Sequence, residues 1–133
     1  MKIEIIQKQL AGTPDFYHSI EVPKEGKLKE EPYIPSGEPR INLDVHWPVP
    51  TVSVGHFNML WIAERKEWVG LEYTPGGSHF ESCWAGVEED SPSIHGPYRL
   101  DQRCASLIRN AYGNTRLPLE KVLTSTPDEL MQR

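Results

Sequence analysis

The sequence has little that could cross-link a fold, hold a metal or anchor the chain in a membrane. Cysteine occurs twice, as Cys83 and Cys104, and one possible bridge is not a disulfide framework, so we expect reduced thiols in a cytoplasmic protein. Because the paired C-x2-C spacing is absent, we expect no structural zinc site. No apolar run approaches about 18 residues, so no transmembrane helix is expected.

Positive charge is also scarce. The chain carries 14 lysines and arginines against 19 aspartates and glutamates, which gives a net charge of -5. Nonspecific binding to nucleic acid requires cations that displace counterions from phosphates. We therefore expect no such binding, and a protein partner of this chain would be expected to present a basic surface.

Apolar residues are sufficient for one hydrophobic core. The hydrophobic content is 38% and includes four tryptophans, and a domain of this size buries roughly two-thirds of the surface that its unfolded chain would expose. We predict a single domain over residues 1–133.

The hydrophobic pattern predicts strands in the first two-thirds of the chain. Residues 2–9 open with alternating apolar and polar side chains, and residues 16–22 follow a turn, so the two segments predict a first hairpin. Two longer apolar runs flank the polar turn at 64–67 and predict a second hairpin, which residues 78–87 would extend as a meander. A short strand is also predicted at 41–47.

The period changes to that of a helix near residue 100. One helical stripe is formed by Leu100, Cys104, Leu107, Ile108 and Ala111, with Gly113 as the C-cap. A second helix is predicted at 118–123, and Thr126-Pro127-Asp128-Glu129 predicts the N-cap of a third. The predicted fold is α+β, an antiparallel sheet of about five strands (hairpin plus meander) covered on one face by two or three C-terminal helices.

Residues 22–50, called the arm below, hold six of the twelve prolines and the charge run KEGKLKEE. Because proline cannot donate to a central ladder, the arm is predicted to be a solvated loop or a sheet edge. We expect Lys24, Glu30, Tyr33 and Trp47 of the arm to contact a partner, since a functional loop explains so long a stretch without structure. Deleting residues 24–31 would then leave the fold intact.

The segment GGSHFESCWAG places His79, Glu81 and Cys83 at alternate positions. On a strand, these three side chains share one face, which alone explains their spacing. A metal site would need further ligands such as His56, His95 or Cys104, and none is implied by the spacing. A Cys83 nucleophile would need another histidine as base, because His79 would lie about 13 Å away along the strand. We expect neither a metal nor a cofactor here.

Arginines near the start of the predicted helix form a second candidate site. Arg99 and Arg103 are four residues apart and would be neighbours on one helix face, with Arg109 further along the polar side. Guanidinium groups bind phosphate and carboxylate well. These three residues therefore predict where a phosphorylated small molecule would bind.

Three classes of function remain, in order of preference. The first is a small acidic, non-catalytic protein that binds and inhibits or regulates a macromolecule, as immunity proteins and phage-encoded anti-defence factors do; the analogy is one of size and charge. The second is a binding protein or sponge for a phosphorylated or nucleotide ligand. The third is a cysteine- and histidine-dependent hydrolase or transferase.

Overall fold

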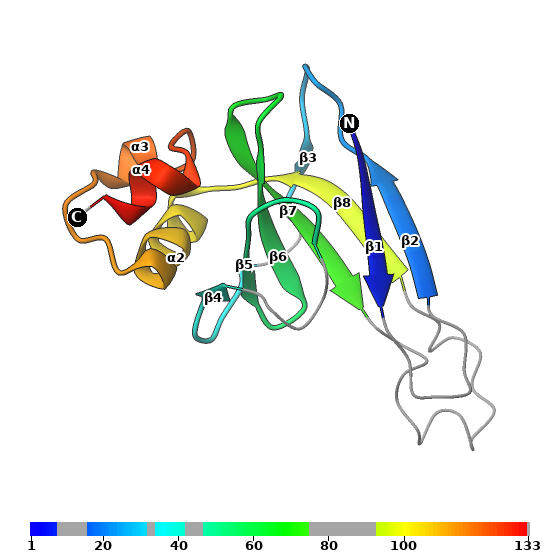
Figure 1. The fold of residues 1–133 in the computed structure, drawn as a ribbon, viewed down its shortest axis with the longest axis horizontal. Coiled ribbons are helices and arrows are strands. Elements are labelled where there is room, and N and C mark those ends of the chain that lie inside the picture. Colours follow the sequence, from blue (N-terminus) through cyan, green and yellow to red (C-terminus); the bar gives the residue numbers. More distant parts are fainter. Residues whose placement is uncertain (8–15, 32–33, 42–46, 75–92, 133) are drawn as a thin grey trace.

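The protein has three layers (Figure 1). The computed structural model describes residues 1–7, 16–31, 34–41, 47–74 and 93–132. A two-stranded sheet forms one outer layer, a six-stranded sheet the middle, and helices the other outer layer. The strands are β1 (Lys2–Gln7), β2 (Phe16–Glu21), β3 (Lys29–Glu30), β4 (Arg40–Ile41), β5 (Thr51–Val54), β6 (Phe57–Ile62), β7 (Glu67–Thr74) and β8 (Ser93–Arg99). The helices are α2 (Gln102–Tyr112), α3 (Leu119–Val122) and α4 (Pro127–Met131).

The strand order of the middle sheet is β3-β8-β7-β6-β5-β4. Neighbours are antiparallel, as predicted for a meander, except that β3 runs parallel to β8. The α+β class is confirmed. The prediction of one antiparallel sheet of about five strands is wrong in detail, because the first hairpin pairs only with itself and the arm adds a strand at each edge.

The alternation of β6 explains why both faces of the middle sheet are covered. All six of its side chains are buried. Met59 and Trp61 point into a core shared with the helices, whereas Leu60 and Ile62 point into a second core shared with β1 and β2. A strand buried on both faces has a continuous apolar sequence, as the run FNMLWI has.

The tryptophans are accommodated by these two cores. Trp61 and Trp68 are directly opposite each other in β6 and β7, on the same face, with ring centroids 5.9 Å apart. Trp68 is 2% exposed and its Nε1 donates to the Ser125 carbonyl at 2.9 Å. Trp47 is half-buried against the second core. Trp84 lies outside the described residues.

The strand β8 was not predicted. It contains Gly96 and Pro97, and proline cannot donate to a ladder. The pairing with β7 shifts register here, between the Gly70–Tyr98 and Glu72–His95 pairs. A β-bulge of this kind interrupts the period-two pattern by which a strand is recognised in a sequence. The predicted strand at 78–87 lies outside the described residues.

The predicted caps of the first and last helices are confirmed. The Asp101 side chain accepts from the backbone N–H groups of Arg103 and Cys104, and Gly113 ends α2 in the left-handed conformation with φ 65°. Thr126 and Glu129 form the predicted capping box of α4. Pro118 is the N-cap of α3 and so lies just outside its expected place in the first turn. No helix within the described residues has the length and apolar character to cross a membrane.

The arm contributes one strand to each edge of the middle sheet. Its side chains at Lys24, Lys27 and Glu30 are exposed, as predicted, but its backbone supplies the edge strands β3 and β4. Of the strand predicted at 41–47, Ile41 lies in β4, residues 42–46 are outside the described part, and Trp47 is not in a strand. Deleting residues 24–31 would remove the edge strand β3, and the expectation that the fold tolerates this deletion stays a prediction.

Gly70 of β7 lies against the core that the middle sheet shares with the helices, and its close contacts there allow the packing of that core to be tested. A Cβ on Gly70 would lie 2.5 Å from Phe57 Cζ and 2.9 Å from Leu100 Cδ2. Because overpacking costs about 1–3 kcal/mol, Gly70→Ala should lower the free energy of unfolding by that amount in urea denaturation. The Gly70→Ala/Phe57→Leu double variant should lose less than the sum of the two single variants. An additive result would show that the added methyl group does not meet the Phe57 ring.

Candidate functional site

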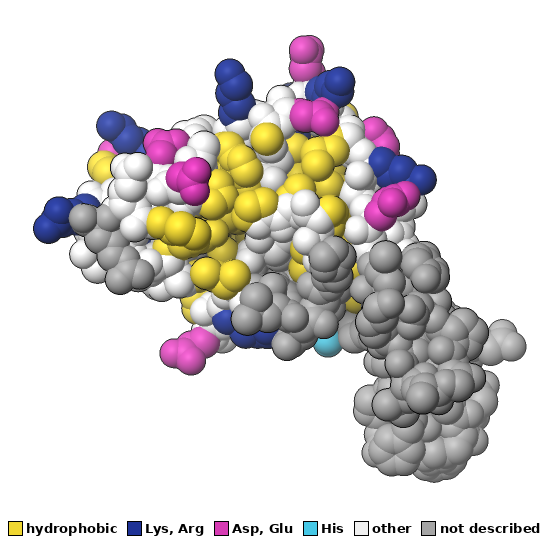
Figure 2. Space-filling view, in the orientation of Figure 1, with side chains coloured by type: hydrophobic (Ala, Val, Ile, Leu, Met, Phe, Trp, Pro, Cys, Tyr) yellow, Lys and Arg dark blue, Asp and Glu magenta, His cyan; other side chains and the backbone are white. Residues whose placement is uncertain are grey.

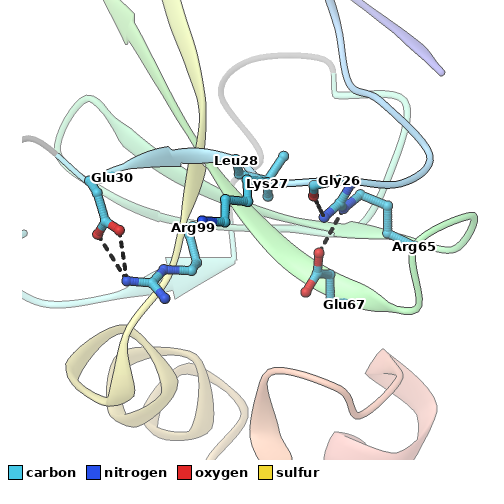
Figure 3. Close-up of a pocket in the computed structure, with 7 residues that line it drawn as sticks. All are labelled: Gly26, Lys27, Leu28, Glu30, Arg65, Glu67 and Arg99. Carbon is cyan, nitrogen blue, oxygen red and sulfur yellow. Dashed lines mark hydrogen bonds and ion pairs between the residues drawn. The ribbon is translucent and has the colours of Figure 1, made fainter.

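A pocket lies between the arm and the middle sheet (Figure 3). Its volume is ≈ 320 Å³. Three parts of the chain form it: the arm up to β3, the β6–β7 turn with the start of β7, and the end of β8. We call it the arm pocket, and it is lined by Gly26, Lys27, Leu28, Glu30, Arg65, Glu67 and Arg99.

Arg65 holds the arm against the β6–β7 turn. Its side chain is 10% exposed, and Nε pairs with Glu67 Oε1 at 2.6 Å. Nη1 donates to the Pro23 carbonyl at 2.8 Å and Nη2 to the Gly26 carbonyl at 2.9 Å. Since every nitrogen of the guanidinium group is engaged, Arg65 is a structural wall of the pocket. The polar turn at 64–67 predicted only a reversal of the chain and gave no sign of this role.

Arg99 and Glu30 face each other because β3 and β8 are paired. The two residues are register partners in this parallel pairing. Arg99 Nη2 lies 2.9 Å from both Glu30 carboxylate oxygens, and the two side chains are 67% and 80% exposed. An ion pair so exposed contributes little to stability. Arg99 can therefore readily exchange the Glu30 carboxylate for another anionic group.

Lys27 makes no ion pair with the described residues. Figure 3 shows its side chain extending from the arm toward Arg99. Together with Arg65 and Arg99 it places three cations in the arm pocket, against the carboxylates of Glu30 and Glu67. The pocket therefore carries an excess of positive charge in a protein whose net charge is -5.

The three arginines predicted to form one ligand site are dispersed. Arg99 is in β8 and not on a helix, which corrects the prediction that it neighbours Arg103 on a helix face. Arg103 is exposed in α2 beside its Asp101 cap. Arg109 Nη1 donates to the Leu117 carbonyl at 3.1 Å and so ties α2 to the segment after it. Of the three, only Arg99 lines the arm pocket.

A second cluster joins the arm to α2. Cys104 Sγ donates to both carboxylate oxygens of Glu31 at 3.4 Å. Ligand atoms of Glu31, Asp101 and Cys104 all lie within 4.8 Å of one another, which is the one grouping among the described residues that could hold a metal ion. It contains no histidine, and His79 and Cys83, around which a metal site was considered, lie outside the described residues.

Electrostatics keep the Cys104 thiol protonated. Its burial, and next the charge of Glu31, raise its pKa far above the ordinary value. A thiolate is the form that binds metal or attacks a substrate, so Cys104 is poorly suited to either role. Burial also raises the pKa of Glu31, although the hydrogen bond from Cys104 opposes this shift. The cluster is best described as a tie between the arm and α2.

The remaining predicted residues divide into two groups. His79, Glu81, Cys83 and Tyr33 lie outside the described residues, so the shared strand face of His79, Glu81 and Cys83 stays a prediction. The other three residues expected to contact a partner make contacts within the chain. Lys24 pairs with Glu64 at 3.8 Å, Glu30 pairs with Arg99, and Trp47 lies against Tyr73 at a ring-centroid distance of 6.2 Å.

Weakening the attachment of the arm should have a measurable cost. Lysine keeps the charge of Arg65 but cannot donate to Glu67 and to both arm carbonyls. Hydrogen bonds of charged groups contribute about 1.5–3 kcal/mol, so Arg65→Lys should lower the free energy of unfolding by about 2 kcal/mol. It should also speed tryptic cleavage in the arm after Lys24 and Lys27. The exposed control, Arg116→Lys, should change neither, and an unchanged cleavage rate in Arg65→Lys would contradict this role.

Glu31 predicts a pH dependence of stability. Because its pKa is raised above 4.5 in the folded protein, its stabilising contribution is fully present below that pH and is lost as the pH rises through the folded pKa. Glutamine mimics the protonated acid. The stability of Glu31→Gln relative to the wild type should therefore increase between about pH 4 and about pH 7 in urea denaturation. A constant difference would show that the environment of Glu31 does not disfavour its charge.

Comparison of the chain with protein-family models, with curated proteins and with solved structures found no match. Function is therefore inferred from the residues and geometry of this chain alone.

Proposed function

We propose that this protein acts without catalysis, by binding another macromolecule through residues 34–41 of the arm. The observation that carries the proposal is the exposure of two isoleucines. Ile34 and Ile41 are 50% and 45% exposed, and among the described residues only Met131 is another exposed large hydrophobic side chain. Two of these three side chains thus lie within one eight-residue segment, IPSGEPRI.

The segment is held in a defined path. β3 precedes it and β4 forms its last two residues, and these two strands lie at opposite edges of the middle sheet. Glu31 contacts α2, and a Cβ added at Gly37 would lie 3.6 Å from Val54 Cγ1, so the backbone of the segment passes close to the core shared with the helices. Pro35 is buried. A segment that is ordered before binding loses less conformational entropy when it binds, which favours a specific complex.

The surface supports this proposal. Figure 2 shows a face on which hydrophobic side chains gather over the centre while charged side chains lie mainly toward its margin. An apolar centre with a polar rim is typical of protein interfaces. Individual exposed isoleucines need no functional explanation, but two of the three exposed large hydrophobic side chains among the described residues lie in this one segment.

The electrostatic part of the proposal concerns a basic partner. Several exposed acids of the described surface are paired internally, including Glu4 with Lys2 and Glu21 with the N-terminal amine. In the sequence, residues 75–92 contain four acids (Glu81, Glu88, Glu89 and Asp90) and neither lysine nor arginine. This stretch accounts for most of the net charge of -5 and is expected to steer a basic partner during association.

The isoleucines provide the test. The tagged protein would be used to capture a partner from a lysate of its source cell, and the affinity of the purified pair would then be measured. If the two side chains enter a pocket of the partner, Ile34→Ser/Ile41→Ser should weaken binding by about tenfold or more. Exposed side chains contribute little to folding, so the thermal unfolding of this variant should stay close to that of the wild type.

The matched control is Met131→Ser, which removes an exposed hydrophobic side chain from α4. It should bind as the wild type does. Association should also slow as salt is raised, because exposed charges are screened beyond about 10 Å at 0.1 M. Equal affinities for the double isoleucine variant and the wild type would refute the proposed contact segment.

A further inference from the structure

We propose that the arm pocket binds a small molecule through a phosphate group, with Lys27 and Arg99 contacting the anion. Glu30 is then an internal carboxylate that occupies part of the site and is displaced by the ligand. This inference concerns a different surface from residues 34–41 and goes beyond the proposed interaction function.

The donors available in the arm pocket identify the contacting residues. Arg65 is excluded because its three nitrogens already bind Glu67 and the carbonyls of the arm. Lys27 lines the pocket and has no ion pair within the part of the chain that the structure describes. In the same part of the chain, the Arg99 side chain uses Nη2 for Glu30 and makes no other hydrogen bond. Its Nε and Nη1 can therefore donate to a ligand.

The Glu30 carboxylate shows what kind of group the site accepts. It is held by Arg99 at 2.9 Å in a pair whose members are 67% and 80% exposed, so the interaction is weak enough to be exchanged. A free monocarboxylate would have no advantage over this tethered one. A phosphate monoester carries a charge of about -1.5 to -2 and three strong acceptor oxygens, so it can contact Lys27 and Arg99 together.

The shape of the pocket limits the ligand to a small one. Its volume of ≈ 320 Å³ is at the lower end of the range for ligand sites, roughly 300–1,000 Å³. Leu28 contributes an apolar side chain to the lining and Glu67 a carboxylate already paired with Arg65. When Glu30 moves away, the cations of the lining outnumber the remaining carboxylate of Glu67 by two, which favours a dianion.

Binding can be measured with inorganic pyrophosphate as the probe, at constant ionic strength, by titration calorimetry and by amide chemical shifts of the full-length protein. Saturable binding is expected, with shifts at Gly26 and Arg99. Lys27→Gln should weaken it by about fivefold or more, because it removes a direct charge-assisted contact. Lys29→Gln removes the same charge from β3, outside the lining, and should weaken binding by less than about twofold.

Glu30 supplies the sharper comparison. Glu30→Gln removes the competing carboxylate and should strengthen pyrophosphate binding by about threefold or more. Glu25→Gln is the matched control, since it removes an exposed carboxylate of the same arm that does not line the pocket, and it should have a smaller effect. Circular dichroism would establish that each variant is folded. The proposal is overturned if pyrophosphate does not bind saturably, if Lys27→Gln and Lys29→Gln weaken binding equally, or if Glu30→Gln fails to strengthen it more than Glu25→Gln.

Discussion

The burial of both faces of the middle sheet is the constraint on which the rest of this structure depends. Apolar side chains of β6 and β7 point alternately to the two faces, and neither face can be left in water without losing about 25 cal/mol for each Å² of apolar surface. The hairpin of β1 and β2 covers one face and the helices the other. Each outer layer is small, so neither forms a core without the sheet between them.

The arm completes this arrangement at the edges of the sheet. Unpaired edge strands invite association with other chains, and short, charged edge strands reduce that risk. β3 and β4 are two residues long each, and Arg65 and the Glu31–Cys104 contact attach the arm to the turn and to α2. The same attachments create the arm pocket and leave Ile34 and Ile41 exposed, so structure and proposed function share one segment of the chain.

The sequence predicted the elements well and their partners poorly. The stripe from Cys104 to Ala111, the Gly113 cap and the Thr126 capping box all lie in or end the expected helices, whereas Leu100 precedes the N-cap of α2. The arm was predicted to be solvated because six prolines and a charge run normally mark such a segment. Its charged side chains are indeed exposed. Its backbone nevertheless pairs with β8 through β3, and β8 could not be predicted because Gly96 and Pro97 interrupt the sequence pattern of a strand.

The candidate site shows the same division between sequence and structure. By itself, the sequence determined which stretches are helical, which alternate as strands and where the turns and caps fall, because these depend on residues within a few positions of one another. Only the tertiary structure decided that Arg99 meets Glu30, 69 positions away, and that Cys104 meets Glu31, 73 positions away. Periodicity records which face of an element is apolar, but not which element will cover it. The pairing of distant charges follows from sheet order, which is set by how all the layers pack at once.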